Sequence, residues 1–337
     1  MLSSLIRLIK CEDDFKYGSH QYAANAQIED RVSAVKMGKS LLVSVFDGHG
    51  GWQVAERLRS SLPANFVEAS RTLDAAAALP VAFVAADEEL KQVLGSAYSL
   101  GFSKLARVGA CGLSLLIEDD KITVANAGDC KAVLSRRGKA IALNRQLNAN
   151  DPFEQDKLRL AHPGEDDIVR CKREWTVKEP LGGWWGGTKE VVRFGGCYVK
   201  GVLQPTKSFG DFYLKDDRFK TDFDRNRSFI RSERLSFPYI TAEPDTSEIA
   251  RSRDDEFVIL ASDGLWDELT DEEACEVARQ AKAANSSPEA VAVLLVKAAL
   301  AKAADSASMR VEDLVRLPQG PQRRSLHDDI SVIVVFL

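Results

Sequence analysis

The most informative segment of the chain reads Phe46-Asp47-Gly48-His49-Gly50-Gly51. It follows an apolar run at residues 41–45, which predicts a buried strand. An aspartate, a glycine and a histidine at the end of a strand suit a metal-bound water that lies beside a proton donor. The segment therefore predicts a strand end that takes part in metal-dependent chemistry.

Four further acidic clusters follow the same pattern, with carboxylates beside or just beyond a predicted strand. They lie at Ile28-Glu29-Asp30, Ala127-Gly128-Asp129, Ser262-Asp263-Gly264-Leu265-Trp266-Asp267 and His327-Asp328-Asp329-Ile330. A single acid of this kind is usually a turn residue or a helix cap, whereas the whole set is uncommon. Carboxylates gathered from several strand ends are ligands that Mg²⁺ and Mn²⁺ prefer, so the set predicts a binuclear site for these ions.

The composition excludes several classes of protein. The chain has 337 residues, a hydrophobic content of 45% and a net charge of −5, values that fit a globular protein with a sizeable core. It has no block rich in lysine and arginine, which argues against nucleic acid as a partner. It also has no apolar run near the roughly 20 residues that a membrane span needs.

The cysteines and the first residues bear on the cellular compartment. Six cysteines are scattered without a C-x-x-C pair, which favours reduced, mostly buried thiols in an intracellular protein. The first ten residues, MLSSLIRLIK, suit either the stub of a mitochondrial transit peptide or an apolar element that opens the domain. We favour the second interpretation, and hence a cytoplasmic location over a mitochondrial one.

Predicted strands come in runs, and predicted helices lie between the runs. We expect strands at residues 41–46, 112–118, 121–126, 131–136, 140–143, 256–261 and 331–337, and helices at 52–60, 79–94, 152–161, 271–284 and 288–304. This order predicts an α+β fold with antiparallel sheets. The stretch at about residues 165–206 is irregular, so we expect one domain over residues 1–337 that is interrupted by an insertion or flap.

Six segments, in one order along the chain, carry a resemblance to a known family. They read ANAQIEDR at residues 24–31, VFDGHGG at 45–51, VANAGD at 124–129, SFGD at 208–211, LASDGLWD at 260–267 and HDDISVI at 327–333. Together they resemble the metal-dependent serine/threonine phosphatases of type 2C over nearly the whole chain. The resemblance implies a central sandwich of two antiparallel β-sheets with helices on both outer faces. Residues 24–31, 143–163 and 238–244 look like the pyruvate dehydrogenase phosphatase branch, although its substrate does not carry over with the likeness.

The resemblance implies that the acidic strand ends hold Mg²⁺ or Mn²⁺ ions. Two ions are expected per site, with Asp47 as the bridging ligand. The other ligands of these two ions are expected to be Asp263, Asp328, Glu29 and the carbonyl group of Gly48. Asp129 and Asp267 are expected to form a weaker third site.

The resemblance also implies a mechanism and a substrate. A hydroxide that bridges the two ions is expected to attack phosphorus directly, with Asp30 orienting the water and Asp47 holding both ions. His49 is expected to protonate the leaving oxygen. The substrate class is phosphoserine and phosphothreonine in proteins. We expect a monomer, because no heptad pattern suggests a coiled coil.

The chain departs from the family at the position where many members place a phosphate-binding arginine. That position, four residues before Glu29, is Asn25 here. An asparagine can donate a hydrogen bond to phosphate but brings no charge, so Asn25 is only a candidate phosphate-binding residue. Arg31 is nearby, but it lies on the other side of the motif.

Three alternatives compete with this interpretation. Residues 130–136 match the C-x5-R pattern of cysteine-dependent phosphatases, but their alternating apolar residues predict a strand instead of a phosphate loop. A catalytically silent scaffold with the same fold is expected to lose at least one metal-binding carboxylate, and all are present. A calcium-binding protein is disfavoured because no segment fits an EF-hand loop.

Overall fold

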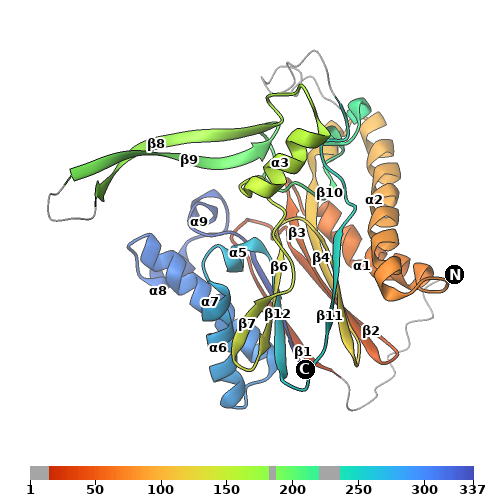
Figure 1. Cartoon of the computed structure of the whole chain (residues 1–337), viewed down its shortest axis with the longest axis vertical. Coiled ribbons are helices and arrows are strands. Elements are labelled where there is room, and N and C mark those ends of the chain that lie inside the picture. Colours follow the sequence, from red (N-terminus) through yellow and green to blue (C-terminus); the bar gives the residue numbers. More distant parts are fainter. Residues whose placement is uncertain (1–14, 182–186, 220–235) are drawn as a thin grey trace.

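The computed structural model of the chain describes residues 15–181, 187–219 and 236–337 (Figure 1). The segment at residues 1–10, for which a transit peptide was weighed, lies outside the described residues. Within the described part, no helix combines the length and apolar character that a membrane crossing requires.

Two antiparallel sheets form the centre of the molecule. One has the strand order β1-β13-β12-β6-β7, and the other has the order β11-β5-β4-β3-β2, with the short β10 paired to β4. The strands of the first sheet are Lys16–Tyr22 (β1), Ile330–Phe336 (β13), Asp255–Ala261 (β12), Lys131–Arg136 (β6) and Lys139–Ala142 (β7). Those of the second are Asp245–Ala250 (β11), Lys121–Ala127 (β5), Gly109–Ile117 (β4), Ser40–His49 (β3), Arg31–Met37 (β2) and Phe209–Gly210 (β10).

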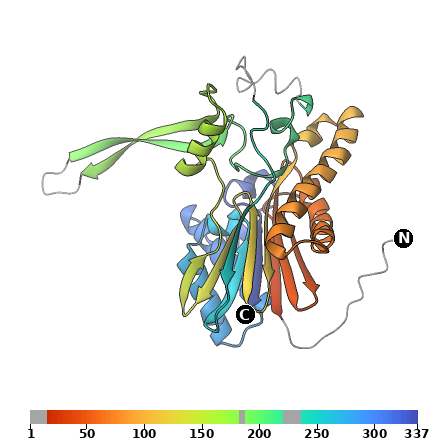
Figure 2. The ribbon, with the colours of Figure 1, turned by 45° about the vertical axis from the view of Figure 1, so that its right-hand side comes forward.

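Long helices cover the outer face of each sheet. Figures 1 and 2 show α1 (Gln53–Ala69) and α2 (Ala75–Ser99) beside the second sheet, and α6 (Asp271–Ala283) and α7 (Pro288–Ser306) beside the first. The shorter helices are η1 (Ser103–Arg107), α3 (Pro152–Ala161), η2 (Phe212–Leu214), η3 (Asp217–Phe219), α5 (Asp263–Trp266), α8 (Val311–Arg316) and α9 (Pro321–Arg324). The predicted α+β sandwich with helices on both outer faces is confirmed.

The alternation of side chains along β3 explains this layering. Leu42 and Phe46 point to the helices and belong to the cluster formed with α1 and α2. Leu41, Val43 and Val45 point the other way, into the cluster between the two sheets. Because both faces of the strand are buried, its sequence is a nearly continuous apolar run. This packing carries Asp47 and His49 to the end of the strand, where the apolar run stops.

A long hairpin projects from the sandwich, as Figure 2 shows, and we call it the arm. It consists of β8 (Val169–Leu181) and β9 (Gly187–Val199), which pair in antiparallel fashion. The expectation of irregular structure at residues 165–206 was wrong for these strands, because cross-strand pairing orders a sequence that has no clear alternation. Cys171 and Cys197 pair across the base of the arm as a disulfide, which corrects the expectation of reduced thiols at these two positions.

A buried ion pair anchors the arm to the body. Lys200, directly after β9, is 1% exposed, and its Nζ contacts the carboxylates of Glu165 and Asp167. The carboxylate of Glu165 also accepts hydrogen bonds from the Tyr239 hydroxyl, at 2.9 Å, and from Ser236 Oγ, at 2.5 Å. A buried ammonium group is tolerated only when it is paired in this way, so the cluster ties both ends of the arm to the segment that follows residue 235.

Candidate active site

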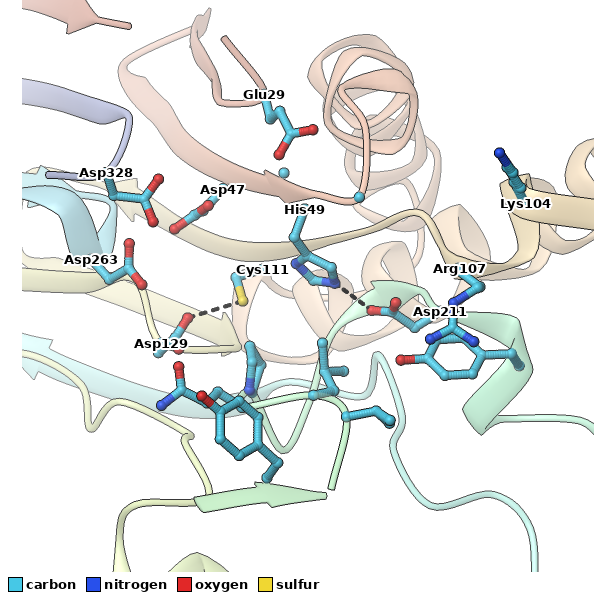
Figure 3. A pocket seen from close by; sticks show the side chains of 18 of the residues that line it. Glu29, Asp47, His49, Lys104, Arg107, Cys111, Asp129, Asp211, Asp263 and Asp328 are labelled. Atoms are coloured by element: carbon cyan, nitrogen blue, oxygen red, sulfur yellow. Dashed lines mark hydrogen bonds and ion pairs between the residues drawn. The ribbon is translucent and has the colours of Figure 1, made fainter. Parts of the chain in front are cut away.

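A pocket of about 1050 Å³ opens at the end of the sandwich where β3 ends (Figure 3). Acidic side chains line one part of its wall, and the arm's C-terminal base lines another. The acidic residues are Glu29, Asp47, Asp129, Asp211, Asp263 and Asp328. The residues from the base of the arm are Tyr198, Val202, Leu203, Gln204 and Pro205.

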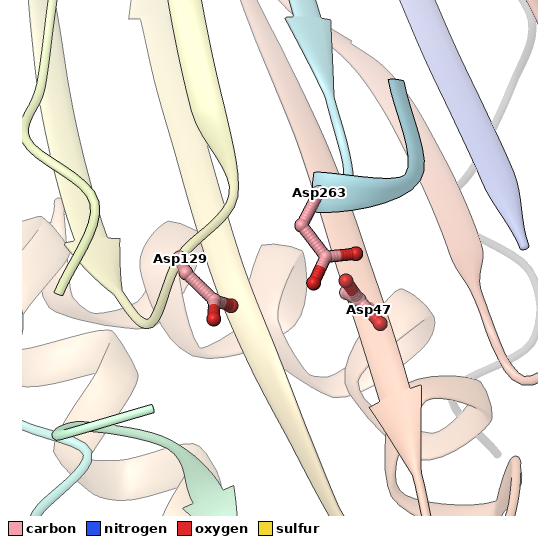
Figure 4. Close-up of side chains that lie close together, drawn as sticks. All are labelled: Asp47, Asp129 and Asp263. Atoms are coloured by element: carbon pink, nitrogen blue, oxygen red, sulfur yellow. The ribbon is translucent and has the colours of Figure 1, made fainter. Parts of the chain in front are cut away.

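Three carboxylates from different elements converge in this pocket. Asp47 is near the end of β3, Asp129 follows β5, and Asp263 begins α5 directly after β12. One carboxylate oxygen from each lies within 4.8 Å of the others, and Figure 4 shows the three side chains pointing toward a common space. Figure 3 adds Asp328, which precedes β13 and points toward Asp263. Strand ends from both sheets therefore bring these acids together.

Crowding and burial make these carboxylates unstable as a cluster of bare anions. Burial raises the pKa of Asp47 well above its ordinary value, and the neighbouring charges of Asp263 and Asp30 raise it further. Burial and the charge of Asp129 likewise raise the pKa of Asp263. Burial raises the pKa of Asp328 to about 6, although Arg324 opposes the shift. Such a cluster favours a bound cation, which offsets the repulsion.

Gly48 allows the segment that carries Glu29 to cross β3 closely. A Cβ atom at position 48 would lie 2.4 Å from the carbonyl oxygen of Glu29, a distance that no side chain permits. The same approach leaves Asp30 buried, and its Oδ2 has no hydrogen-bond partner among the described residues. Burial and the charge of Asp329 raise the pKa of Asp30 well above its ordinary value.

Asp329 fastens this segment to β13. Its Oδ1 accepts hydrogen bonds from the backbone N–H groups of Ala24, at 2.7 Å, and Asn25, at 3.0 Å. Its Oδ2 accepts from the backbone N–H of Glu29 at 2.8 Å. Asp329 thus acts on the segment around Glu29 and Asp30, whereas its neighbour Asp328 faces the pocket.

Asp129 is oriented by two side chains. The thiol of Cys111 donates to Asp129 Oδ1 at 3.0 Å, and the amide Nδ2 of Asn148 donates to Oδ2 at 2.8 Å. Cys111 lies on β4, opposite Asp47 on β3. The thiol therefore helps to hold Asp129 next to Asp47, and burial raises the pKa of Cys111, which keeps the thiol protonated as a donor.

His49 lies on the opposite side of the acidic cluster from Asp328, as Figure 3 shows. Its Nε2 lies 2.6 Å from Oδ2 of Asp211, a carboxylate that is fully buried and also accepts from Ser208 Oγ at 2.7 Å. Gly109 makes the contact possible, because a Cβ there would lie 2.0 Å from the same Oδ2. Burial lowers the pKa of His49, but the charge and hydrogen bond of Asp211, together with the charges of Asp129 and Glu29, hold the pKa above its ordinary value.

Three residues singled out by sequence, Asp30, Asp267 and Asn25, are not among the residues that line the pocket. Asp267 is the C-cap of the short helix α5 and is exposed. Asn25 does not line the pocket, and its Nδ2 donates to Asp329 Oδ2 at 3.0 Å. Arg31, which lies on the other side of the same motif, pairs with Glu56 at 2.5 Å. The hydrogen bonds of Asn25 thus serve the fold around Asp329.

The donor set fits Mg²⁺ or Mn²⁺. All the converging side chains offer hard carboxylate oxygens, and Oδ1 of Asp263 is buried without a hydrogen-bond partner among the described residues.

The competing cysteine chemistry does not fit, because Cys130 is fully buried and burial raises the pKa of its thiol well above the ordinary value. A nucleophilic cysteine needs the opposite, an accessible thiol with a lowered pKa.

Sequence reasoning assigned no role to Asp211 or to Asp329. Asp211 ends the SFGD segment, and its left-handed backbone, with φ of 49°, marks it as unusual for a residue other than glycine. Asp329 stands beside a predicted ligand, and the doubled acid Asp328-Asp329 is the signal that was available.

Comparison with known proteins agrees with this geometry. The family model described as "Protein phosphatase 2C" matches residues 18–308. The "Probable protein phosphatase 2C 61" of Oryza sativa subsp. japonica is 36% identical over 326 residues, covering 93% of this chain and 79% of the relative. The "Probable protein phosphatase 2C 42" of Arabidopsis thaliana is 32% identical over 335 residues, covering 97% of this chain and 79% of the relative.

Solved structures show the same fold at low sequence identity. A serine-threonine phosphatase 2C from Toxoplasma gondii superposes with a TM-score of 0.62 at 15% identity, covering 96% of this chain and 94% of that one. A sex determining protein of C. elegans gives a TM-score of 0.62 at 18% identity, covering 96% of this chain and 65% of that one. Because the family model matches most of this chain, the chain belongs to the protein phosphatase 2C family and is a protein serine/threonine phosphatase.

Proposed function

We propose that the chain hydrolyses phosphoserine and phosphothreonine in proteins by direct attack of water on phosphorus. The observation that carries the proposal is the convergence of Asp47, Asp129 and Asp263, whose ligand oxygens lie within 4.8 Å of one another beside His49. Bound Mg²⁺ or Mn²⁺ supplies Lewis-acid charge, which lowers the pKa of water and offsets the negative charge of the phosphoryl oxygens.

The proposed ligands divide between two ions and a weaker third. Asp47 would be the ligand shared by both ions, and the remaining ligands of the pair would be Glu29, the Gly48 carbonyl, Asp263 and Asp328. Asp129 contributes to the third site, supported by its contacts with Cys111 and Asn148. The exposed position of Asp267 makes it the weakest member of this set.

Two other residues are proposed to act on the water and on the leaving oxygen. Asp30 orients the attacking water, supported by its buried Oδ2 that lacks a hydrogen-bond partner among the described residues. His49, with its pKa raised by Asp211, donates a proton to the serine or threonine oxygen as the P–O bond breaks. The attacking water releases a proton to solvent, the leaving oxygen gains one from His49, and His49 regains a proton from solvent, so the products are inorganic phosphate and a free hydroxyl side chain.

The finer assignments also stand as proposals. We propose one catalytic domain, with residues 165–206 as an insertion, and a monomer, which light scattering on the purified chain tests. An intracellular, cytoplasmic location is tested by microscopy of a tagged chain. The relatives named above carry no label of the pyruvate dehydrogenase phosphatase branch, so the proposal extends to the family and not to that branch's substrate.

The decisive experiment is phosphate release from a phosphothreonine peptide. We expect turnover with Mn²⁺, loss of turnover with EDTA, and loss with Mn²⁺ in the Asp47→Asn variant. No turnover by folded wild-type protein with Mn²⁺ would instead support the silent-scaffold alternative.

A further inference from the structure

Arginine and lysine side chains on the pocket wall lie on two sides of the acidic cluster. Within the described part of the chain, the pocket is lined by Lys104, Arg107 and Arg324. Lys104 and Arg107 belong to η1, and Figure 3 shows both on the side of His49 and Asp211. Arg324 belongs to α9 and lies next to the carboxylates themselves. A phosphate monoester is a dianion, so these cations are candidates to bind it.

Arg324 contacts a proposed metal ligand. Its Nη2 reaches Oδ2 of Asp328, four residues further along the chain, and its side chain is 46% exposed. The guanidinium group therefore lies at the mouth of the acidic cluster, with solvent on one side and carboxylates on the other.

The segment that contains Asn25 lies against α9. The backbone N–H of Gly320 donates to the carbonyl oxygen of Ala24 at 2.8 Å, and Nη1 of Arg323 donates to that of Ala23 at 3.1 Å. Arg323 is buried and so fixes the helix, while the next residue, Arg324, is exposed and turns to the pocket. The fold thus brings Arg324 to the edge of the pocket, near the segment in which the uncharged Asn25 stands.

We propose that Arg324 binds the phosphoryl group of the substrate, and that it exchanges its ion pair with Asp328 for this contact when Asp328 binds a metal ion. The inference rests on the function proposed above. A divalent cation on Asp328 would repel the guanidinium group of Arg324. It would also neutralise the carboxylate charge of Asp328 that attracts this group. A phosphoryl group in the same pocket offers two oxygens that match the planar fork of arginine.

This exchange predicts effects of opposite sign at one residue. Removing Arg324 takes away a cation that competes for Asp328, so metal binding becomes tighter. The same change takes away a phosphate ligand, so phosphate binding becomes weaker. A purely structural role of Arg324 in holding α9 or β13 would weaken both, because both depend on the position of Asp328.

The test compares Arg324→Gln and Arg324→Lys with wild type and with the control Arg316→Gln. Arg316 is a suitable control because it is an exposed arginine of the neighbouring α8 that pairs only loosely with Asp313, at 3.8 Å. Electron paramagnetic resonance of free Mn²⁺ gives the metal Kd without substrate. Competition of inorganic phosphate with p-nitrophenyl phosphate gives Ki, and calorimetry of phosphate binding to the Mn²⁺-loaded protein gives the same comparison without turnover.

We expect Arg324→Gln to lower the Kd for Mn²⁺ roughly threefold to fivefold, the size expected for a half-exposed ion pair. We expect it to raise the Ki for phosphate about tenfold or more, as for the loss of a charge-assisted contact. Both constants of Arg324→Lys should lie between those of wild type and Arg324→Gln, since lysine keeps the charge but lacks the planar fork of arginine. Both constants of Arg316→Gln should match those of wild type.

Either an unchanged Ki or an unchanged or weaker Mn²⁺ affinity in Arg324→Gln overturns the proposal. A rise of Ki in Lys104→Ala but not in Arg324→Gln would assign phosphate to the η1 side instead. Failure of the proposed function is a separate result, because it is seen as absent Mn²⁺-dependent turnover in wild type, whatever the variants do.

Discussion

The imidazole Nε2 of His49 and the carboxylate Oδ2 of Asp211 lie 2.6 Å apart, at the end of the pocket away from Asp328. The two residues are separated by 162 positions in sequence, and the close approach requires the missing side chain of Gly109 between them. A buried carboxylate on the far nitrogen orients the ring and favours its protonated form. Asp211 is thus a positioning residue for the proposed general acid.

Asp211→Asn is expected to shift the pH dependence of catalysis. A general acid works only while protonated, so activity falls as the pH rises through its pKa. Asp211 raises the pKa of His49, so its loss lowers that pKa and moves the alkaline limb of the kcat/KM profile to lower pH. The measurement is phosphopeptide turnover against pH with saturating Mn²⁺. The exposed Asp245→Asn serves as a charge control, and an alkaline limb that stays in place would speak against the coupling.

His49→Ala is expected to slow the hydrolysis of different substrates unequally. Serine and threonine are poor leaving groups that need a proton, so we expect a loss of about 10²-fold or more on a phosphothreonine peptide. The leaving group of p-nitrophenyl phosphate needs little protonation and should be affected much less. Comparing kcat for the two substrates checks this, and equal losses would contradict a general-acid role.

Mn²⁺ is expected to stabilise the protein against heat through the acidic cluster. Binding at one hundred times the Kd adds about 2.7 kcal/mol to the free energy of unfolding, so the Tm should rise by several degrees and fall again with EDTA. Scanning calorimetry measures both. Asp47→Asn should remove the shift, together with turnover, while Asp254→Asn on the surface should keep it.

The metal-free Asp47→Asn variant provides its own control for folding. Burial and neighbouring charges raise the pKa of Asp47, so its ionised form destabilises the metal-free protein. The variant should therefore melt at or above the temperature of metal-free wild type. A large drop in its Tm would show that Asp47 has a structural role that the cluster's repulsion does not account for.

Glu165→Gln is expected to weaken the attachment of the arm in a pH-dependent manner. Despite burial, Lys200 and Ser236 hold the pKa of Glu165 below its ordinary value of 4.5. Its contribution to stability is thus present above that pH and is lost as the pH falls through the lower, folded-state pKa. Leaving Lys200 buried without this partner should cost about 3 kcal/mol at pH 7. Urea unfolding at pH 7 and near pH 3 checks this, and an equal cost at both would contradict it.

The fold could be predicted where apolar runs are strong. β3, β12 and β13 are buried on both faces, and the predicted positions of these strands are confirmed within a few residues. The predicted start of a helix at residue 271 is also confirmed, where Thr270 and Glu273 form a capping box in front of α6. The edge strands β1, β2 and β11 were missed, because their residues are exposed or only half-buried and include too many polar side chains to stand out.

The site could be predicted where a ligand adjoins a strand end. Asp47, Asp129 and Asp263 each follow or end an apolar run, so their common location follows from the layout of the sheets. The role of Asp211 could not be predicted in this way, because it depends on the approach of a distant loop over Gly109. Arg324 was missed for a similar reason, since only the packing of α9 on residues 23–24 brings it to the pocket.

The bonds from Asp329 to residues 24, 25 and 29 span some three hundred positions of sequence. During synthesis the ribosome therefore makes the Glu29 segment long before Asp329 and β13, and β13 lies between β1 and β12 in its sheet. Until β13 has left the exit tunnel, the nascent chain lacks a central strand, Asp328 and the anchor of Glu29. The growing polypeptide should thus be inactive as a phosphatase until β13 takes its place in the sheet.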